Sequence, residues 1–446
     1  MKMEEVKDIL TGLDRYEEFL KKLEKEIQEL DDCRIAIIYT DIKYFKYIND
    51  TYGYQRGDML LKEFTRQVTQ GNASMLCAAR VFSDNIVLAS KVSNSISNEE
   101  VREKVHRHNL EMEKRFRENY SAARLKFCTG ISFISKEDRR LDPATAVSNA
   151  NLARKIAKEM KEDCCVLFDS RMVEGIKKEI EITSSLTRAI ADGELKVYYQ
   201  PKMKTDSVRI DGAEALARWQ KPDGRFIYPD EFIPLIEQSG QIVELDYFVY
   251  REVFKFIAGR MKENKPIVPI SLNVSRAHLD KMEILSYIRS LFEEYRIQPN
   301  MIEFELTENI YIENTEKALQ LIEGLHEMGT KVSMDDFGSG YSSLNLLSRL
   351  PIDIIKLDKV FLQDEELDNH LKENDKIIIS CIVDMAKKLR ITSLCEGVET
   401  PEQSDYLSEI GCELQQGYYF SRPIPEDDFE KFMDRKFSEE NSLITA

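Results

Sequence analysis

Polar side chains recur in the second half of the chain at points where short apolar segments end. Five carboxylates and one amide have this position: Glu214, Asn273, Glu305, Asp335, Asp336 and Glu396. The set offers only oxygen ligands and contains no His or Cys. Oxygen ligands favour Mg²⁺ or Mn²⁺ over zinc. The pattern therefore indicates a site for hard divalent cations.

The number of these acids matters more than any one of them. A single acid at a strand end is more often a solvated charge or a helix cap than a ligand. Five such acids would repel one another strongly in a low-dielectric pocket unless cations neutralised them. Asp335 and Asp336 are adjacent, and adjacent acids on one loop can bridge two metal ions about 3.5–4 Å apart. Gly338 and Gly340 let the backbone turn sharply around them.

Regular alternation of strand and helix patterns positions these acids. Eight apolar segments are strand candidates, mostly separated by helical patterns: 196–200, 213–219, 268–274, 301–306, 331–334, 352–356, 392–395 and 414–416. Eight strands within roughly 250 residues favour a β/α barrel over an open sheet. In such a barrel the catalytic groups lie where strands end and loops begin, which is where the acids stand.

The composition is that of a globular chain. Of the 446 residues 42% are hydrophobic, and no apolar run approaches the roughly 18 residues that a membrane span needs. The N-terminus turns acidic at once and has no apolar stretch typical of a signal peptide, so we expect a cytoplasmic protein with no membrane partner. The eight cysteines form no C-x-x-C pair, which favours reduced core thiols.

The net charge of −17 limits the partners. It argues against a DNA or RNA polymer, because such binding depends on Lys and Arg side chains that neutralise phosphates. It leaves room for a small phosphate ligand held by a few residues or by metal ions.

The first half also alternates between strand and helix patterns. Strands are predicted at 35–39, 75–79, 86–89, 125–134 and 166–168, and helices at 3–30, 58–70, 98–119 and 144–161. This alternation predicts one α/β or α+β domain. A long helix over 172–191 follows directly, without a linker rich in Pro, Gly or Ser. We therefore expect domains at 1–172 and 193–440, joined by a connecting helix at 173–192.

The second half, about residues 180–435, resembles an EAL domain, the family of cyclic-di-GMP phosphodiesterases. Glu214-Ala215-Leu216 spells the family's name, although a tripeptide alone has little weight. Further segments match in the same order: Tyr199-Gln200-Pro201, 229–234, the Asn273 and Glu305/Glu308 segments, 334–344, Lys356-Leu357-Asp358, 396–400 and 416–420. None of the family's catalytic positions is replaced.

This resemblance implies a TIM-like barrel that hydrolyses cyclic-di-GMP to linear pGpG with two Mg²⁺ or Mn²⁺ ions. It implies that Glu214, Asn273, Glu305 and Asp335 hold the first ion, with Asp335 shared, and that Asp336 and Glu396 serve the second. Lys356 would contact the attacking water, either as a base or as an orienting group, and Gln416 would help to order the water network.

The resemblance also implies residues that contact the substrate and a loop that supports dimerisation. Arg218 would hold a phosphate, and Gln200, Leu216 and Asp358 would contact the ligand. Glu308 would anchor the loop from Asp336 to Tyr341. Because the family often dimerises beside this loop, we expect a homodimer formed through the EAL domain.

The first half resembles a GGDEF domain, the nucleotidyl-cyclase-like α/β fold of diguanylate cyclases, with a central sheet. The segments 8–15 and 41–53 carry the resemblance, together with Gly57-Asp58. Where the family has Gly-Gly-Asp-Glu-Phe, this chain has a degenerate signature, Phe82-Ser83-Asp84-Asn85-Ile86.

Three changes argue against cyclase activity. Phe82 and Ser83 place side chains where paired glycines let the backbone approach the nucleotide. Asn85 is a weaker ligand than the family's Glu, and Lys43 replaces a second carboxylate close to the expected Mg²⁺. The family's inhibitory product site, Arg-x-x-Asp, would fall on Ala73 and Leu76 and is also absent.

Four polar residues of the first half are retained: Asp41, Asn49, Asp58 and Asp84. They indicate either residual GTP binding or maintenance of the fold, and we favour the fold. The domain is then expected to regulate, dimerise or dock. Two alternatives to the phosphodiesterase stay open: a receptor that binds cyclic-di-GMP without hydrolysis and signals through a protein partner, and a bifunctional enzyme, which the degenerate signature disfavours.

Overall fold

The computed structural model describes residues 7–69, 73–119, 125–160, 164–207, 209–280, 282–338, 349–362 and 369–444. The chain forms two compact units, Met1–Lys178 and Glu179–Ala446. Helix α6 (Ser170–Ala191) spans the division and covers most of the predicted connecting helix. Among the described helices, none combines the length and the hydropathy that crossing a bilayer requires.

The described part of the N-terminal unit is built on a six-stranded sheet in the order β1-β3-β4-β2-β5-β6. Its strands are β1 (Asp14–Arg15), β2 (Cys33–Lys43), β3 (Met75–Phe82), β4 (Asn85–Ser93), β5 (Lys126–Ile134) and β6 (Cys165–Leu167). Side chains alternate between the two faces of a strand. Ile37 and Tyr39 of β2 therefore contact one apolar cluster, and Ala36 contacts another on the opposite face.

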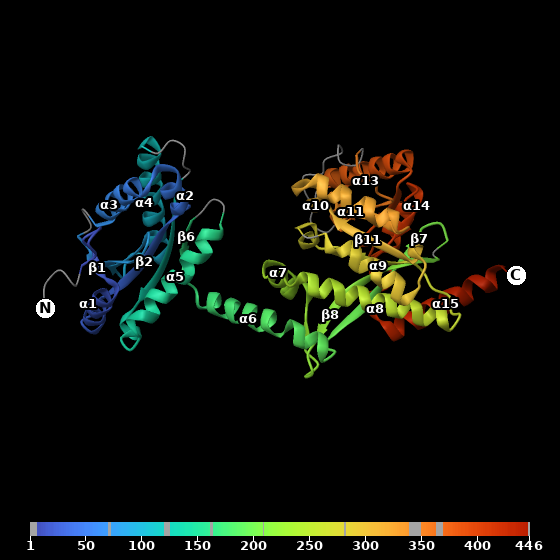
Figure 1. Cartoon of the computed structure of the whole chain (residues 1–446), viewed down its shortest axis with the longest axis horizontal. Helices are drawn as coiled ribbons and strands as arrows, with labels where there is room; N and C mark the ends of the chain where they lie inside the picture. The colour runs from blue at the N-terminus through green and yellow to red at the C-terminus, as the bar shows by residue number, and fades with distance from the viewer. Residues whose placement is uncertain are drawn as a thin grey trace. The chain divides into compact units, whose positions relative to one another are not determined.

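Helices cover both faces of this sheet (Figure 1). α1 (Tyr16–Gln28) and α5 (Pro143–Glu159) pack on one face, and α3 (Tyr54–Thr69) and α4 (Asn98–Asn119) pack on the other. The remaining described helices of this unit before α6 are α2 (Phe45–Tyr52) and the short η2 (Lys136–Asp138).

The predicted first helix begins too early. Residues 1–6 lie outside the described residues, and α1 begins only at Tyr16. Before it, the Asp8 carboxylate accepts a hydrogen bond from the Thr11 amide at 2.8 Å, and Gly12 has a φ of +72°. A side chain that bonds the backbone locally competes with helix formation, and here it produces a turn.

Eight described strands of the C-terminal unit close a barrel. They are β7 (Leu195–Lys204), β8 (Ile210–Gln220), β10 (Ile270–Asn273), β11 (Ile302–Thr307), β12 (Lys331–Phe337), β13 (Ile354–Leu357), β14 (Thr392–Cys395) and β15 (Leu414–Gln415). Each overlaps one of the eight predicted strands, which confirms the barrel. The short strands β9 (Phe226–Ile227) and β16 (Ile424–Pro425) extend the sheet.

The first barrel strand runs against the others. β7 pairs antiparallel with both of its barrel neighbours, β8 and β15. All the other neighbouring strands of the barrel pair in parallel, in the order β8, β10, β11, β12, β13, β14, β15. A parallel connection needs a crossover of a dozen or more residues. Only residues 205–209 separate β7 from β8, so the two strands form a hairpin. The strand pattern alone did not predict this direction.

Helices surround the barrel strands (Figure 1). They are α7 (Pro229–Gln238), α8 (Ile242–Lys262), α9 (Glu283–Tyr295), α10 (Glu308–Glu313), α11 (Thr315–Glu327), α13 (Asn369–Leu389), α14 (Pro401–Glu409) and α15 (Glu426–Ile444), with the short η3 (Arg276–Asp280), η4 (Pro299–Met301) and η5 (Lys359–Leu362). Large buried rings such as Tyr199, Phe254 and Phe304 fill the core between helices and strands. This core fixes the strand ends that carry the acids.

Candidate active site

The strand register brings the predicted oxygen ligands to one end of the barrel. Asn273 lies beside Glu305 in the pair β10–β11, and Asp335 lies beside the last residue of β11. The antiparallel strand β7 places Gln200 opposite Glu214. Residues separated by long stretches of sequence therefore share one site.

A break in the strand β12 lets two consecutive acids face this site. In a regular strand, successive side chains point to opposite faces. Here the register shifts between Met334 and Phe337, and Asp336 has a left-handed φ of +56°. As a result, carboxylate oxygens of Asp335, Asp336 and Glu396 lie within 4.8 Å of one another. Such irregularities are over-represented next to active sites.

Gly338 supports the same irregular segment. Its φ is +99°, and a Cβ atom there would lie 2.2 Å from the ring of Phe361. Only glycine fits this position without moving the ring.

Lys356 occupies the centre of the acid cluster. Its Nζ lies 2.6 Å from Oε2 of Glu305, 2.7 Å from Oε1 of Glu396 and 2.9 Å from Oδ1 of Asp335. Glu214 Oε2 lies slightly farther away, at 3.7 Å. Burial alone would lower the pKa of Lys356, but the carboxylates, first Asp335 and Glu214, raise it well above its usual value.

A second buried lysine, Lys202, was not among the predicted site residues. Its Nζ donates to Oε1 of Glu305 at 2.8 Å and to Oε1 of Glu303 at 3.0 Å. Burial by itself would raise the pKa of Glu305, but Lys202 and Lys356 lower it to about 2. A signal was present in the sequence, because Lys202 stands two residues after Gln200 and therefore shares its face of the strand.

Amide side chains hold the orientation of Glu214. Gln416 Nε2 donates to Oε2 of Glu214 at 2.7 Å and to Oε1 of Gln200 at 3.2 Å. Asn273 Nδ2 donates to Oε1 of Glu214 at 3.0 Å. The hydroxyl of Tyr250 donates to the Asn273 carbonyl oxygen at 2.9 Å, a contact that the sequence did not predict.

The donor set fits hard divalent cations. Every candidate ligand offers oxygen, and each carboxylate of the cluster is buried or half-buried. Burial raises the pKa of Glu214 and of Asp335, and raises that of Glu396 to about 8. Such crowding of acids is what bound cations relieve, and oxygen donors select Mg²⁺ or Mn²⁺.

A cavity of about 690 Å³ reaches the cluster at Glu214, whereas Glu305, Asp335, Asp336 and Glu396 do not line it. Glu214, Leu216, Arg218 and Asn273 line it, and its volume is within the usual range for small-molecule sites. The guanidinium of Arg218 donates to the carbonyl of the preceding residue at 2.8 Å. Asp358 does not line this cavity, and its Oδ1 accepts a hydrogen bond from the Val360 amide at 2.7 Å.

Glu308 is buried and is the first residue of α10. The loop that it was predicted to anchor continues into residues 339–348, which lie outside the described residues. The anchoring by Glu308 and the dimerisation beside this loop stay predictions.

The degenerate signature forms a tight turn between β3 and β4. Ser83 adopts a left-handed φ of +49°, and Phe82 is 62% exposed. Asp84 is buried, and its Oδ2 accepts a hydrogen bond from the Ile42 amide at 2.9 Å. Asn85 is also buried, as is Ile86, which joins the apolar cluster below.

Asp41 is occupied by internal ion pairs. Its Oδ2 accepts from the guanidinium of Arg154 and lies 2.6 Å from Nζ of Lys158. Asp41 and Arg154 are both buried. This pairing favours the interpretation that Asp41 is retained for the fold.

The variant Arg154→Met tests that interpretation. Removing one partner of a buried pair leaves the other charge poorly compensated, so we expect the free energy of opening at β2 to fall by about 3 kcal/mol. The measurement is the opening free energy of β2 amides by hydrogen exchange. Lys158→Met is the matched control, because the Lys158 side chain is 45% exposed and should contribute less than about 1 kcal/mol. Equal losses in both variants would contradict a structural role for Arg154.

Comparisons with known proteins agree with this architecture. Residues 183–423 match the EAL domain family, and residues 5–164 match the family described as diguanylate cyclase, GGDEF domain. The cyclic di-GMP phosphodiesterase NbdA of Pseudomonas aeruginosa is 29% identical over 431 residues, 96% of this chain and 54% of that protein. The cyclic di-GMP phosphodiesterase PdeR of Escherichia coli is 30% identical over 429 residues, 96% of this chain and 63% of that protein.

A solved structure is similar as well. The structure described as PaMucR phosphodiesterase in complex with c-di-GMP has a TM-score of 0.52 and 31% identity. The match covers 56% of this chain and 99% of that chain. The chain spans 54% and 63% of the lengths of the two curated relatives.

Proposed function

The chain belongs to the family of proteins that join a GGDEF domain to an EAL domain, and on this premise we propose that its C-terminal unit hydrolyses cyclic-di-GMP to linear pGpG. The observation that carries the proposal is the gathering of four carboxylates around Lys356 at one end of the barrel, with Asn273 bonded to Glu214 and with Asp336 beside Asp335 and Glu396. The two curated relatives above are described as phosphodiesterases of the same dinucleotide, which supports the choice of substrate.

Two Mg²⁺ or Mn²⁺ ions fit the donor set. Glu214, Asn273, Glu305 and Asp335 would hold one ion, and Asp336 and Glu396 would hold the other together with the shared Asp335. Such ions supply Lewis-acid chemistry, because they make a water more acidic and offset the charge that builds on the phosphoryl oxygens.

The chain's own residues orient the reactants. Lys356 lies within hydrogen-bond reach of three of the ligating carboxylates, so its ammonium can contact a water held between them. Gln416 fixes Glu214 and can order the same water. Arg218 and Leu216 line the cavity, and we propose that Arg218 holds a phosphate there and that Leu216 contacts the ligand. Gln200 and Asp358 do not line the cavity, so their proposed contacts with the ligand lie outside it.

The direct test is incubation of the full chain with cyclic-di-GMP and Mg²⁺ or Mn²⁺, followed by chromatographic detection of pGpG. We expect product that requires the metal and is lost in Glu214→Ala. If micromolar protein yields no product and Glu214→Ala behaves identically, the phosphodiesterase proposal is wrong. Binding of the dinucleotide without turnover, unchanged by EDTA, would instead support the receptor.

The N-terminal unit accompanies the enzyme as a regulatory or dimerising domain without cyclase activity. The side chains at Phe82, Ser83 and Asn85 and the internal pairing of Asp41 support this role. Incubation of the full chain with GTP should yield no cyclic-di-GMP. The same samples can test GTP binding to this unit, and sedimentation can test the homodimer expected through the EAL domain.

Lys202 gives a test of how Glu305 is positioned. In Lys202→Met, one oxygen of Glu305 loses its donor, and changes of this kind behind a metal ligand typically cost 10–100-fold in metal affinity or activity. We expect kcat/KM to fall by about that factor, together with weaker Mn²⁺ binding by calorimetry. Lys204→Met, two residues along the same strand, is the control, because its ammonium lies 3.4 Å from the partly exposed Asp211. Unchanged Mn²⁺ affinity in Lys202→Met would remove Lys202 from the site.

A further inference from the structure

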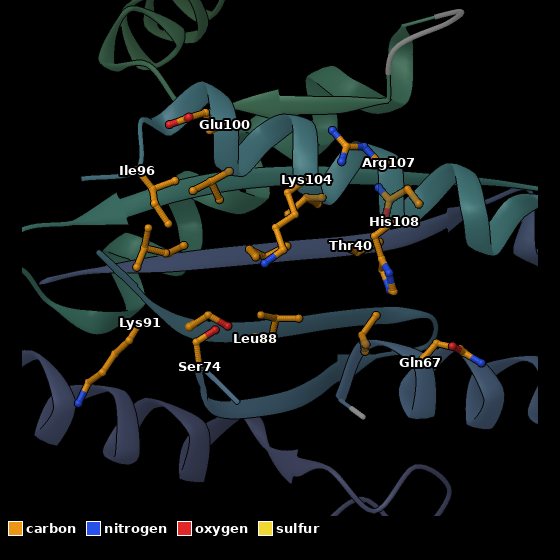
Figure 2. Close-up of a pocket in the computed structure, with 18 of the residues that line it drawn as sticks. Thr40, Gln67, Ser74, Leu88, Lys91, Ile96, Glu100, Lys104, Arg107 and His108 are labelled. Carbon is orange, nitrogen blue, oxygen red and sulfur yellow. The ribbon is translucent and has the colours of Figure 1, made fainter. Parts of the chain in front are cut away.

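α4 leaves part of the N-terminal sheet uncovered. Two separate apolar clusters lie on this face, one around Phe64 and Phe116 and the other around Val101 and Ile131. A cavity of about 600 Å³ lies between β2, β4 and α4 (Figure 2). This volume is within the usual range for small-molecule sites.

The sequence of α4 explains why the cavity exists. Val101, Val105 and Met112 recur at helical spacing and pack toward the strands. The turn between them carries His108 and Asn109 instead of apolar side chains. Residues three and four apart lie on one helix face. His108 and Asn109 follow Val105 at this spacing, so they occupy positions on the sheet-facing side of α4 where apolar residues would be expected.

The floor of the cavity is apolar. Ala36 and Ile38 of β2 and Leu88 and Val92 of β4 line it, and the polar residues Thr40 of β2 and Ser90 of β4 also line the cavity. Ala36 and Ser90 are small, so among the residues that the structure describes no side chain fills the space above them. An apolar body bound here would bury surface that the helix does not cover.

One lysine supplies positive charge to this space. Figure 2 shows Lys104 and His108 directed from α4 into the cavity, whereas Arg107, Glu100 and Lys91 are directed away from it. Among the described residues, Lys104 has no ion-pair partner.

The acids of the lining do not neutralise Lys104. The carboxylate of Glu100 accepts a hydrogen bond from the Ser97 amide at 2.6 Å, which holds it at the start of the helix. Glu111 is exposed, and its charge acts on His108. The cavity therefore combines an apolar floor with a cation at its mouth.

We propose that this cavity binds a small amphipathic anion, with its apolar body on the floor formed by β2 and β4 and its acidic group against Lys104. The site is distinct from the degenerate signature, because Asp41 and residues 82–86 do not line it. It is also independent of the proposed phosphodiesterase site, which belongs to the other unit.

The test uses the full chain and the fluorescent probe anilinonaphthalene sulfonate, which joins aromatic rings to an anion. We expect one saturable site, displacement by decanoate, and weak displacement by decanol. In Lys104→Glu the exposed charge contact becomes repulsive, so affinity for the probe should fall about fivefold. Lys114 lies on the same helix but outside the lining, so Lys114→Glu should bind the probe with an affinity within twofold of the wild-type value.

A second variant tests the floor. Ser90→Phe fills the cavity and should abolish probe binding, with the fold verified by circular dichroism. Hydrogen exchange with bound decanoate should protect amides of β4 and α4. Equal displacement by decanoate and decanol, displacement by cyclic-di-GMP, or probe affinity that neither Lys104→Glu nor Ser90→Phe changes would each overturn the proposal.

Discussion

Asp335→Asn is expected to lower kcat/KM for hydrolysis of cyclic-di-GMP by at least roughly 10³-fold. In the proposed site Asp335 would be shared by both cations, and metal ions contribute several kcal/mol of charge stabilisation in the transition state. The substitution keeps the size of the side chain and removes its charge. The measurement is pGpG formation under saturating Mn²⁺, together with a calorimetric Mn²⁺ titration that should show weaker binding.

Asp353→Asn is the matched control for that prediction. Asp353 stands before β13, and its Oδ2 accepts from the Val332 amide at 2.8 Å and lies 2.9 Å from Nε2 of His326. It therefore lies at the opposite end of the strands, where conserved chemistry in barrels serves stability rather than catalysis. We expect the kcat/KM of Asp353→Asn to stay within twofold of the wild-type value. If Asp335→Asn kept its turnover within tenfold, the assignment of a shared ligand would be wrong.

The sequence predicted the barrel because its strands are short apolar runs with acids at their ends. It predicted the candidate ligands for the same reason, and the structure brings Glu214, Asn273, Glu305, Asp335 and Glu396 together around Lys356 or one another. The alternation of residue types along a strand indicates which face each side chain occupies, so these positions can be inferred from the sequence alone.

Other features of the fold and the site depend on strand direction and strand pairing, and the spacing of apolar residues along the sequence does not determine either. The direction of β7 follows from the length of one connection, and the shared orientation of Asp335 and Asp336 follows from a shift in strand pairing. Lys202 was missed because a lysine within a strand reads as a solvent-facing charge, although this one is only 2% exposed. The turn before α1 was missed because a side-chain contact of Asp8 overrides the helical pattern.

Lys356→Met is expected to lower both stability and kcat. The stability reports the role of Lys356 as counter-ion of the buried carboxylates, and kcat reports its proposed contact with the attacking water. The ammonium is the internal counter-ion of Glu305, Asp335 and Glu396, and removing one partner of a buried ion pair typically costs about 3–5 kcal/mol. We therefore expect a clear fall in the melting temperature, and a fall in kcat of about 10²–10⁴-fold, the usual contribution of a positioned proton donor or acceptor.

The decisive measurement for Lys356→Met is the stabilisation by Mn²⁺. Without the ammonium, the carboxylates lack their nearest positive charge, so a bound cation relieves more repulsion and should raise the melting temperature more than it does in the unchanged chain. Lys331→Met, at the exposed start of β12, should change neither stability by more than about 0.5 kcal/mol nor kcat. A Mn²⁺ stabilisation equal to that of the unchanged chain would mean that Lys356 and the cations do not share the same carboxylates, and the proposed arrangement of the site would have to be rebuilt.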